Sequence, residues 1–155
     1  MKYKLNIFVV AILFVGIVSS CKKSNDPEVT PVGPYANGAF ISNEGTFGLA
    51  NASVSFYDFN GDSVRNSIYS VVNNHPLGQV LQSVYLSNGF AYMMMNLSDT
   101  VVITTADDFK DAGTITGLSS PRYMTSYNNK GYITQWGENG VVKVVDLSLH
   151  TILKT

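Results

Sequence analysis

A glycine followed by an aromatic residue recurs along this chain and opens a short run of strand-forming residues each time. Gly89-Phe90 and Gly131-Tyr132 begin two such runs, and the glycines lie 42 positions apart, from 89 to 131. An earlier copy begins at Gly38-Ala39-Phe40. Each copy continues through a polar loop into a β-branched segment, a turn and a shorter apolar segment. A period of this length is typical of chains that repeat one supersecondary unit.

The repeat divides into about three units of short strands, and we find no segment with the periodicity of a helix. The expected strands are 38–42, 52–58 and 63–69; 79–86, 89–94, 100–104 and 113–115; and 122–127, 131–135, 141–146 and 150–153. Asn and Gly at 87–89 and 128–131 supply the positive φ angles that tight hairpins need. The first unit lacks a leading strand, because a proline-containing segment precedes Gly38.

Units of four antiparallel strands with a period of about 40–50 residues are typical of β-propeller blades. A single β-sandwich is the alternative, since its strands also recur every ~8–12 residues, but a sandwich does not require the glycine-aromatic strand to recur in step. We therefore expect an all-β chain, a β-propeller of four-stranded antiparallel blades. Propellers have about 4–8 blades. Residues 38–155 supply about three, so we expect an incomplete ring, the N-terminal portion of a longer protein or a truncated product.

The first 20 residues have the order of an export signal. Lys2 and Lys4 precede an apolar run from Leu5 to Val18, and two serines lead into Cys21, the single cysteine. This order resembles the lipobox of bacterial lipoproteins, in which the cysteine carries the lipid. A plain secretory signal and a transmembrane anchor are the alternatives; the run is shorter than the ~20 apolar residues of a spanning helix.

The predicted organisation is therefore a lipoprotein signal peptide over 1–20, a lipidated Cys21 with a flexible tether over 21–37, and a partial β-propeller over 38–155. Two acyl chains give stable anchoring, and we expect the protein to be lipid-anchored at the outer membrane or cell surface. The formal net charge is −1, and this balance lacks the basic excess of a nucleic-acid partner.

No catalytic constellation is visible. The nucleophile-elbow and P-loop patterns are absent. His75 and His150 fall in different units without a neighbouring cysteine or paired carboxylate. We expect His75 to be a solvated loop residue and His150 to lie at the surface. The sequence predicts no catalytic residue, no metal site and no cofactor.

Binding is the better hypothesis, and strand order predicts where it occurs. Loops alternate between the two faces of a propeller, so connections from second to third strand share a face with those between blades. Aromatic, amide and charged side chains on that face suit a polar, partly flat ligand such as a cofactor, a glycan or a protein surface. The candidate ligand-binding residues are Asn43, Glu44, Phe47, Asn96, Arg122, Trp136 and Glu138. The alternative is that they cap turns and fill gaps between blades.

Several segments resemble one known family. Asn43 to Gly48 followed by Asn51 to Asp58 resembles the opening blade of the YncE-like surface β-propeller lipoproteins, and Pro121 to Met124 with Lys130 to Thr134 and Val144 to Leu147 resembles a later blade. One branch of that family comprises cobalamin-capturing lipoproteins of the BtuG type, which cap an outer-membrane transporter. The resemblance implies a lipid-anchored, non-catalytic protein that captures a small nutrient such as a corrinoid for an outer-membrane transporter. A structural or adhesion surface protein is the alternative, and a propeller enzyme is a third hypothesis.

Overall fold

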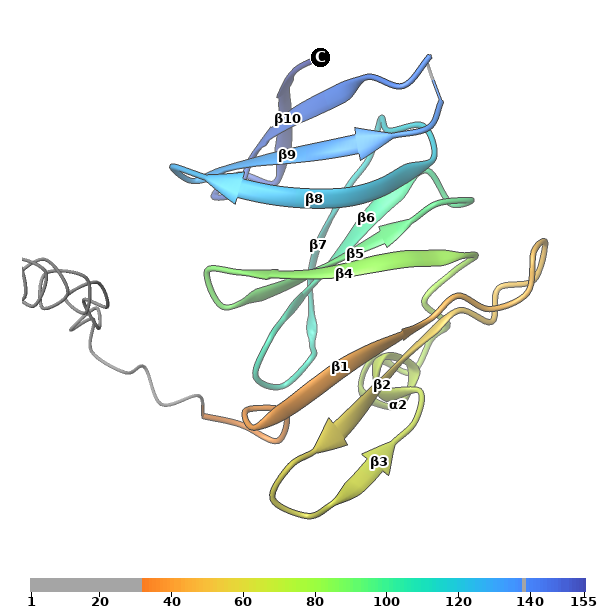
Figure 1. Ribbon diagram of the computed structural model, residues 1–155, viewed down its shortest axis with the longest axis vertical. Coiled ribbons are helices and arrows are strands. Elements are labelled where there is room, and N and C mark those ends of the chain that lie inside the picture. The colour runs from red at the N-terminus through yellow and green to blue at the C-terminus, as the bar shows by residue number, and fades with distance from the viewer. Residues whose placement is uncertain (1–31, 138) are drawn as a thin grey trace, which may run out of the picture.

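The computed structural model describes residues 32–137 and 139–155, which form three antiparallel sheets and one short helix (Figure 1). The first sheet has the order β1 (Gly38–Asn43), β2 (Ser53–Asp58), β3 (Ser63–Arg65). The second has the order β4 (Leu81–Ser87), β5 (Phe90–Met95), β6 (Thr100–Thr105), β7 (Asp111–Ile115). The third contains β8 (Pro121–Tyr127), β9 (Lys130–Gln135), β10 (Val142–Asp146) and β11 (Thr151–Lys154) in sequence order across the sheet.

The sheets follow one another like successive blades, with β1, β4 and β8 side by side (Figure 1). The expected all-β, propeller-like fold of antiparallel units is confirmed. Within the described residues the first sheet has three strands and lacks a counterpart of β4 and β8, as the sequence predicted. Over this same part of the chain, no helix has the length and apolar character that crossing a bilayer demands.

The core lies in two layers between the sheets, and β5 contributes to both because alternate residues of a strand point to opposite faces. Met93 packs with Val54 and Phe56 between the first and second sheets. Tyr92 and Met94 pack on the other face, between the second and third sheets. Every residue of β5 after Phe90 is therefore buried.

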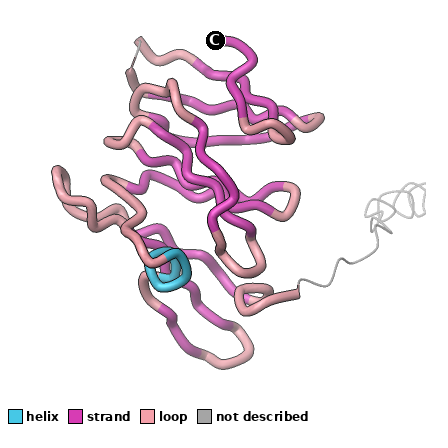
Figure 2. The backbone as a smooth tube through the Cα atoms, turned by 180° about the vertical axis from the view of Figure 1, so that it is seen from behind, coloured by secondary structure: helices cyan, strands magenta, loops and turns pink. Residues whose placement is uncertain are grey.

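The prediction of no helix, with a strand over 63–69, is wrong. The strand ends at Arg65, and a helix labelled α2 (Ile68–Asn73) follows in the connection from the first to the second sheet (Figure 2). β-branched residues favour strands on propensity, but burial overrides it here. Ile68 and Tyr69 are almost fully buried in the first core layer, whereas all three residues of β3 are exposed.

The spacing of 42 residues between Gly89 and Gly131 does not correspond to the structural repeat. Gly89 lies in the two-residue turn between β4 and β5, with φ 78°, and the matching turn between β8 and β9 ends at Asn129, with φ 59°. Gly131 instead lies inside β9 and pairs with Val145. The two glycines therefore occupy different positions, and the second and third sheets match with a smaller offset, as Asn88 and Asn128 show.

Residues 32–37, which the sequence analysis placed in the tether, lie against the first sheet. Tyr35 is buried beside Phe56 and Phe109, at ring-centroid distances of 5.2 and 5.9 Å. The export signal, Cys21 and the rest of the tether lie outside the described residues.

Candidate ligand-binding site

A pocket of about 440 Å³ lies on the face formed by the loops after β1, β5 and β9. The candidate residues were predicted to lie on this face, which we call the loop face. The pocket is lined by Glu44, Gly45, Phe47, Val80, Gln82, Asn96, Leu97, Arg122 and Trp136. Five of the seven predicted residues therefore lie together, drawn from all three sheets.

Three of the lining residues occupy the same position in their sheets. Glu44, Asn96 and Trp136 each come directly after the strand that carries the repeat, namely β1, β5 and β9. The backbone N–H of Asn96 donates to Val80 O at 2.8 Å, and the backbone N–H of Trp136 donates to Ser120 O at 2.9 Å. The repeat thus places one residue of each sheet at an equivalent position in the lining of the same pocket.

Two further lining residues sit at matching β-bulges. In the second sheet Leu81 pairs with Met95 and Ser83 with Met94, which leaves Gln82 without a cross-strand partner. Near the start of β8, Arg122 likewise has no cross-strand partner. A bulge inserts one residue and re-aims its side chain. Gln82 and Arg122 both line the pocket.

Sequence reasoning missed Gln82. The signal that could have found it is its position beside Leu81, which corresponds to Arg122 beside Pro121 once the two leading strands are aligned. No particular residue type marks the bulge, since Gln82 and Arg122 differ. The bulge could therefore not be predicted from the sequence.

The aromatic side chains of the pocket are exposed. Trp136 is 70% exposed and Phe47 is 81% exposed. The Arg122 guanidinium carbon lies 5.5 Å from the Trp136 ring centroid and 5.8 Å from that of Tyr123. Both distances fall within the range of cation–π attraction. The arrangement offers aromatic surface beside a fixed positive charge.

Asn96 contributes differently, because it is 7% exposed and its amide nitrogen donates to Pro121 O at 3.3 Å. This contact ties the loop after β5 to the first residue of β8. Asn96 is therefore a buried part of the pocket lining and links the second and third sheets at the loop face.

Two predicted residues do not join the pocket. The Asn43 side chain donates to Ser53 Oγ at 3.2 Å and to Ser55 Oγ at 2.9 Å, on the face of the first sheet that points away from the second. Its role in the described structure is to pair these hydroxyls. Glu138 lies outside the described residues.

Residues 37–155 match the family model described as a domain of unknown function, DUF5074. This chain belongs to the DUF5074 family. No curated protein matches it. Among solved structures it is similar to a chain of the nidogen/laminin complex, with a TM-score of 0.59 and 15% identity over 79% of this chain and 44% of that chain. It is also similar to Kuenenia stuttgartiensis hydrazine synthase, with a TM-score of 0.60 and 15% identity over 86% of this chain and 38% of that chain.

At this identity the two likenesses show the fold of the DUF5074 chain alone. The chain spans less than half the length of either solved chain. Within the described residues no group of three or more His, Cys, Asp or Glu side chains is placed to hold a metal ion.

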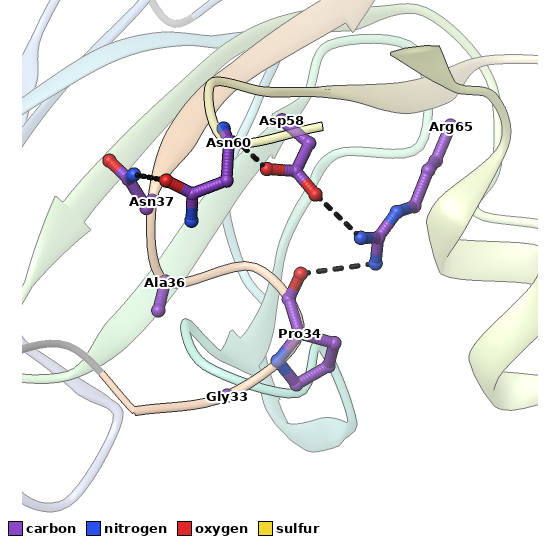
Figure 3. A pocket seen from close by; sticks show the side chains of 7 residues that line it. All are labelled: Gly33, Pro34, Ala36, Asn37, Asp58, Asn60 and Arg65. Carbon is purple, nitrogen blue, oxygen red and sulfur yellow. Dashed lines mark hydrogen bonds and ion pairs between the residues drawn. The ribbon is translucent and has the colours of Figure 1, made fainter. Parts of the chain in front are cut away.

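A second hollow, of about 600 Å³, is closed by polar contacts at the start of the described DUF5074 chain (Figure 3). Arg65 donates to Asp58 Oδ2 at 2.8 Å and to Pro34 O at 3.1 Å. The Asn37 side chain donates to Asn60 Oδ1 at 2.7 Å. Hydrogen bonds from the backbone of residues 60 and 61 hold the pKa of the Asp58 carboxyl below its usual value, with Arg65 adding to the effect. These contacts clamp residues 33–37 onto the hairpin between β2 and β3.

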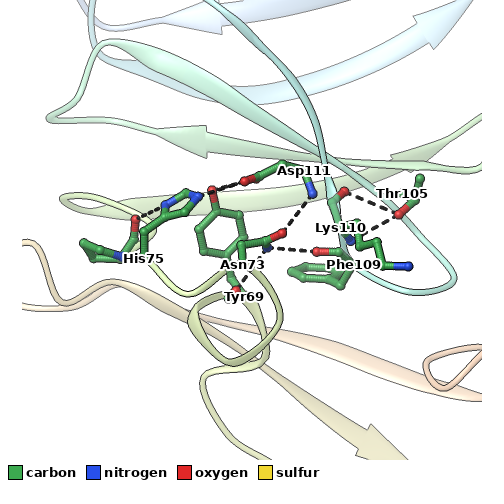
Figure 4. Close-up of polar contacts among 8 residues, drawn as sticks. Tyr69, Asn73, His75, Thr105, Phe109, Lys110 and Asp111 are labelled. Atoms are coloured by element: carbon green, nitrogen blue, oxygen red, sulfur yellow. Dashed lines mark hydrogen bonds and ion pairs between the residues drawn. The ribbon is translucent and has the colours of Figure 1, made fainter.

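His75 is exposed, as expected, but it has a carboxylate partner from the next unit. Its Nε2 lies 2.8 Å from Asp111 Oδ2, and the Tyr69 hydroxyl donates to Asp111 Oδ1 at 2.8 Å (Figure 4). The Asn73 side chain donates to Phe109 O, and the Asp111 amide donates to Asn73 Oδ1, both at 3.0 Å. This network joins α2 to β7. It lies apart from the residues that line the loop-face pocket, so it is a structural link between the first two sheets.

His150, expected at the surface, is half-buried. Its ring packs edge-on against Phe90 and Tyr92, with centroid distances of 5.5 and 6.1 Å. A left-handed backbone, with φ 54°, turns the residue back toward the second sheet. The turn before β11 therefore brings one side of the His150 ring against the second sheet.

Proposed function

We propose that this DUF5074 chain is a non-catalytic binding module of the cell envelope, which holds a polar, partly flat small molecule in the loop-face pocket. The observation that carries the proposal is the convergence of equivalent positions from three sheets on one pocket. Glu44, Asn96 and Trp136 follow equivalent strands, and Gln82 and Arg122 sit at equivalent bulges.

The surface chemistry of the pocket supports a flat ligand. A mostly exposed aromatic ring leaves apolar surface in contact with water. A ligand that covers this surface gains about 25 cal/mol of binding free energy per Å² of apolar area buried. Trp136 and Phe47 offer two such rings. Arg122 is held against the Trp136 ring, so it reaches a ligand without losing much side-chain freedom. Aromatic and arginine side chains carry a large share of binding energy at most interfaces.

The volume of the pocket limits the ligand. About 440 Å³ lies within the ~300–1,000 Å³ range of small-molecule sites. A corrinoid is larger than a typical drug-sized molecule, so the pocket would cover one face or edge of it. The resemblance to cobalamin-capturing lipoproteins makes a corrinoid the first ligand to test, and its flat macrocycle with peripheral amides suits Trp136 and Gln82.

The proposal extends to location. A lipid on Cys21, as the sequence predicts, would hold the loop face at the outer membrane or cell surface, where a captured nutrient passes to a transporter. Mass spectrometry of the mature protein tests the anchor, since an unmodified Cys21 contradicts it.

Isothermal titration calorimetry of the full chain against cobalamin and a panel of glycans tests the binding role. We expect one saturable site for a member of the panel. Trp136→Ala should weaken it at least about fivefold, which corresponds to about 1 kcal/mol or more. Leu149→Ala is the matched control, because Leu149 is also 70% exposed but lies in the turn between β10 and β11. Absence of heat with every compound favours the structural or adhesion role.

A further inference from the structure

The two bulged residues of the loop-face pocket lie on neighbouring strands that are tied together. β4 and β8 run side by side (Figure 1), and Gln82 and Arg122 occupy matching bulges near the starts of these strands. The Ser83 hydroxyl donates to Arg122 O at 2.6 Å. Because Ser83 directly follows Gln82, this hydrogen bond holds the two bulges next to each other. The fold thus places Gln82 and Arg122 in one part of the pocket lining.

Neither of these side chains has a hydrogen-bond partner among the described residues. A guanidinium carries five N–H donors, and a primary amide carries two. Gln82 and Arg122 are both half-buried, and no described group accepts a hydrogen bond from either side chain. Donors that are partly shielded from water and lack an acceptor within the chain are available to a ligand.

Arg65, the other arginine of the chain, is engaged in a different way. It forms an ion pair with Asp58 at 2.8 Å and also donates to Pro34 O. None of the ion pairs between described residues includes Arg122. Glu44 lines the same pocket, but it follows β1, and the second sheet lies between β1 and β8 (Figure 1). The positive charge of Arg122 is therefore not neutralised by an ion pair within the described chain.

The aromatic neighbours of Arg122 restrict its side chain without accepting conventional hydrogen bonds from it. The guanidinium carbon lies 5.5 Å from the Trp136 ring centroid and 5.8 Å from that of Tyr123, and this attraction acts through the faces of the rings. A planar guanidinium offers parallel N–H donors that match two oxygens of a carboxylate or a phosphate. Arg122 is therefore pre-organised for an oxyanion, and the Gln82 amide adds a further donor beside it.

An uncharged ligand would match this part of the pocket less well. Hydrogen bonds between ionised partners are about twice as strong as those between neutral ones. A ligand that covered Arg122 and Gln82 without offering an acceptor would remove their donors from water without compensation, which costs binding free energy. The two side chains therefore favour an anionic group over a neutral group of the same shape.

We propose that Gln82 and Arg122 form an oxyanion subsite of the loop-face pocket, and that the ligand carries a carboxylate or phosphate group next to its flat part. The subsite rests on the ligand-binding role proposed above for this pocket. Arg122 binds the oxyanion through its fork of N–H groups, and Gln82 donates from the neighbouring strand. Ser83 is a positioning residue, because its hydroxyl holds the backbone of Arg122 beside Gln82.

Isothermal titration calorimetry of the full chain with two matched pairs of compounds tests this proposal. Adenosine monophosphate and adenosine differ by a phosphate, and trigalacturonate and its methyl ester differ in the charge of their carboxylates. We expect the anionic member of at least one pair to bind at least about tenfold more tightly than its neutral partner. The pair that shows this preference identifies the oxyanion as a phosphate or a carboxylate.

Variants of the full chain locate the preference. Arg122→Gln should reduce it at least about fivefold, and Arg122→Lys, which keeps the charge but not the fork of donors, should retain part of it. Ser83→Ala should reduce the preference by a smaller factor. Arg65→Gln is the matched control, because it removes the same charge from a residue that does not line the pocket, and it should leave the preference unchanged. Thermal unfolding shows that each variant folds.

Equal affinities within both pairs overturn the oxyanion subsite, and so does a preference that survives Arg122→Gln or is lost equally in Arg65→Gln. Absence of binding by both anionic compounds overturns it too. A neutral compound that binds leaves the ligand-binding role of the pocket in place, so that the subsite alone fails. Absence of heat with every compound, cobalamin and the glycans included, contradicts both the subsite and the binding role.

Discussion

The Arg122 guanidinium carbon lies 5.5 Å from the centroid of the Trp136 ring, where the bulge of β8 meets the loop after β9. Arg122 lies in β8 and Trp136 directly follows β9, and their counterparts in the second sheet are Gln82 and Asn96. Their contact combines the single tryptophan of the chain with the positive charge of the candidate site. It is therefore the most direct probe of the pocket.

Replacement of Arg122 should alter the surroundings of Trp136 with little effect on stability. An exposed cation–π contact contributes about 0.5–1 kcal/mol, so Arg122→Met should lower the free energy of unfolding by about 1 kcal/mol or less. The emission of Trp136 should nevertheless shift, because the charge above its ring is gone. Arg65→Met is the control: it removes the contacts to Asp58 and Pro34 and should leave the emission maximum in place.

Gly137 should tolerate no side chain. A Cβ at this residue would lie 1.8 Å from Ser119 Oγ and 2.6 Å from Ser119 Cβ, and a short side chain has little room to move. Gly137→Ala should therefore destabilise the fold by about 1–3 kcal/mol, as overpacking generally does. Ser119→Gly in the same chain should restore part of the loss in a urea titration. Equal stability of the wild type and Gly137→Ala would show that the loop after β9 moves freely.

The His75–Asp111 pair should make stability depend on pH. The hydrogen bond to Asp111, with a smaller effect from Pro76 O, raises the pKa of His75. Because the pKa of His75 is higher in the folded than in the unfolded protein, protonation of His75 stabilises the folded state. This stabilisation is complete at pH values below the unfolded-state pKa of about 6.5. That contribution is lost as the pH rises through the folded pKa. The stability difference between wild type and His75→Gln should thus be larger at about pH 5.5 than at about pH 8.

Asp111→Asn provides the matched test of this pH dependence, because it keeps the shape of the side chain and removes its charge. It should reduce the pH dependence in the same way in urea titrations across the range. A difference between wild type and His75→Gln that stays constant with pH would contradict a role for the charged imidazole.

Tyr92 should tolerate loss of its hydroxyl. The side chain is fully buried between the second and third sheets, and no described group forms a hydrogen bond with its hydroxyl. Removing an unsatisfied buried group is neutral or favourable, so Tyr92→Phe should leave stability unchanged or raise it by up to about 1 kcal/mol. Tyr85→Phe is the control, since the Tyr85 hydroxyl bonds to Ser126 at 3.0 and 3.1 Å. It should lose about 0.5–1.5 kcal/mol.

Most strands were predictable because turn residues and β-branched runs mark them directly. The loop face was predictable because antiparallel order decides on which side each connection lies. Helix α2 was not, since Ile68 and Val72 have strand propensity and become helical through burial against the first core layer. The role of Asn43 was also hidden, because its hydrogen bonds to Ser53 and Ser55 depend on cross-strand register rather than on neighbours in sequence.

Fluorescence titration of Trp136 tests the central claim, that the loop-face pocket binds a ligand. The chain has one tryptophan, so the signal reports on this pocket alone, and free N-acetyltryptophanamide corrects for absorption by the added compound. With cobalamin, or with one of the glycan panel, we expect a saturable change whose midpoint moves at least about fivefold in Phe47→Ala and Arg122→Ala. A signal that stays at the corrected baseline with every compound, or a midpoint that neither substitution moves, would contradict the account.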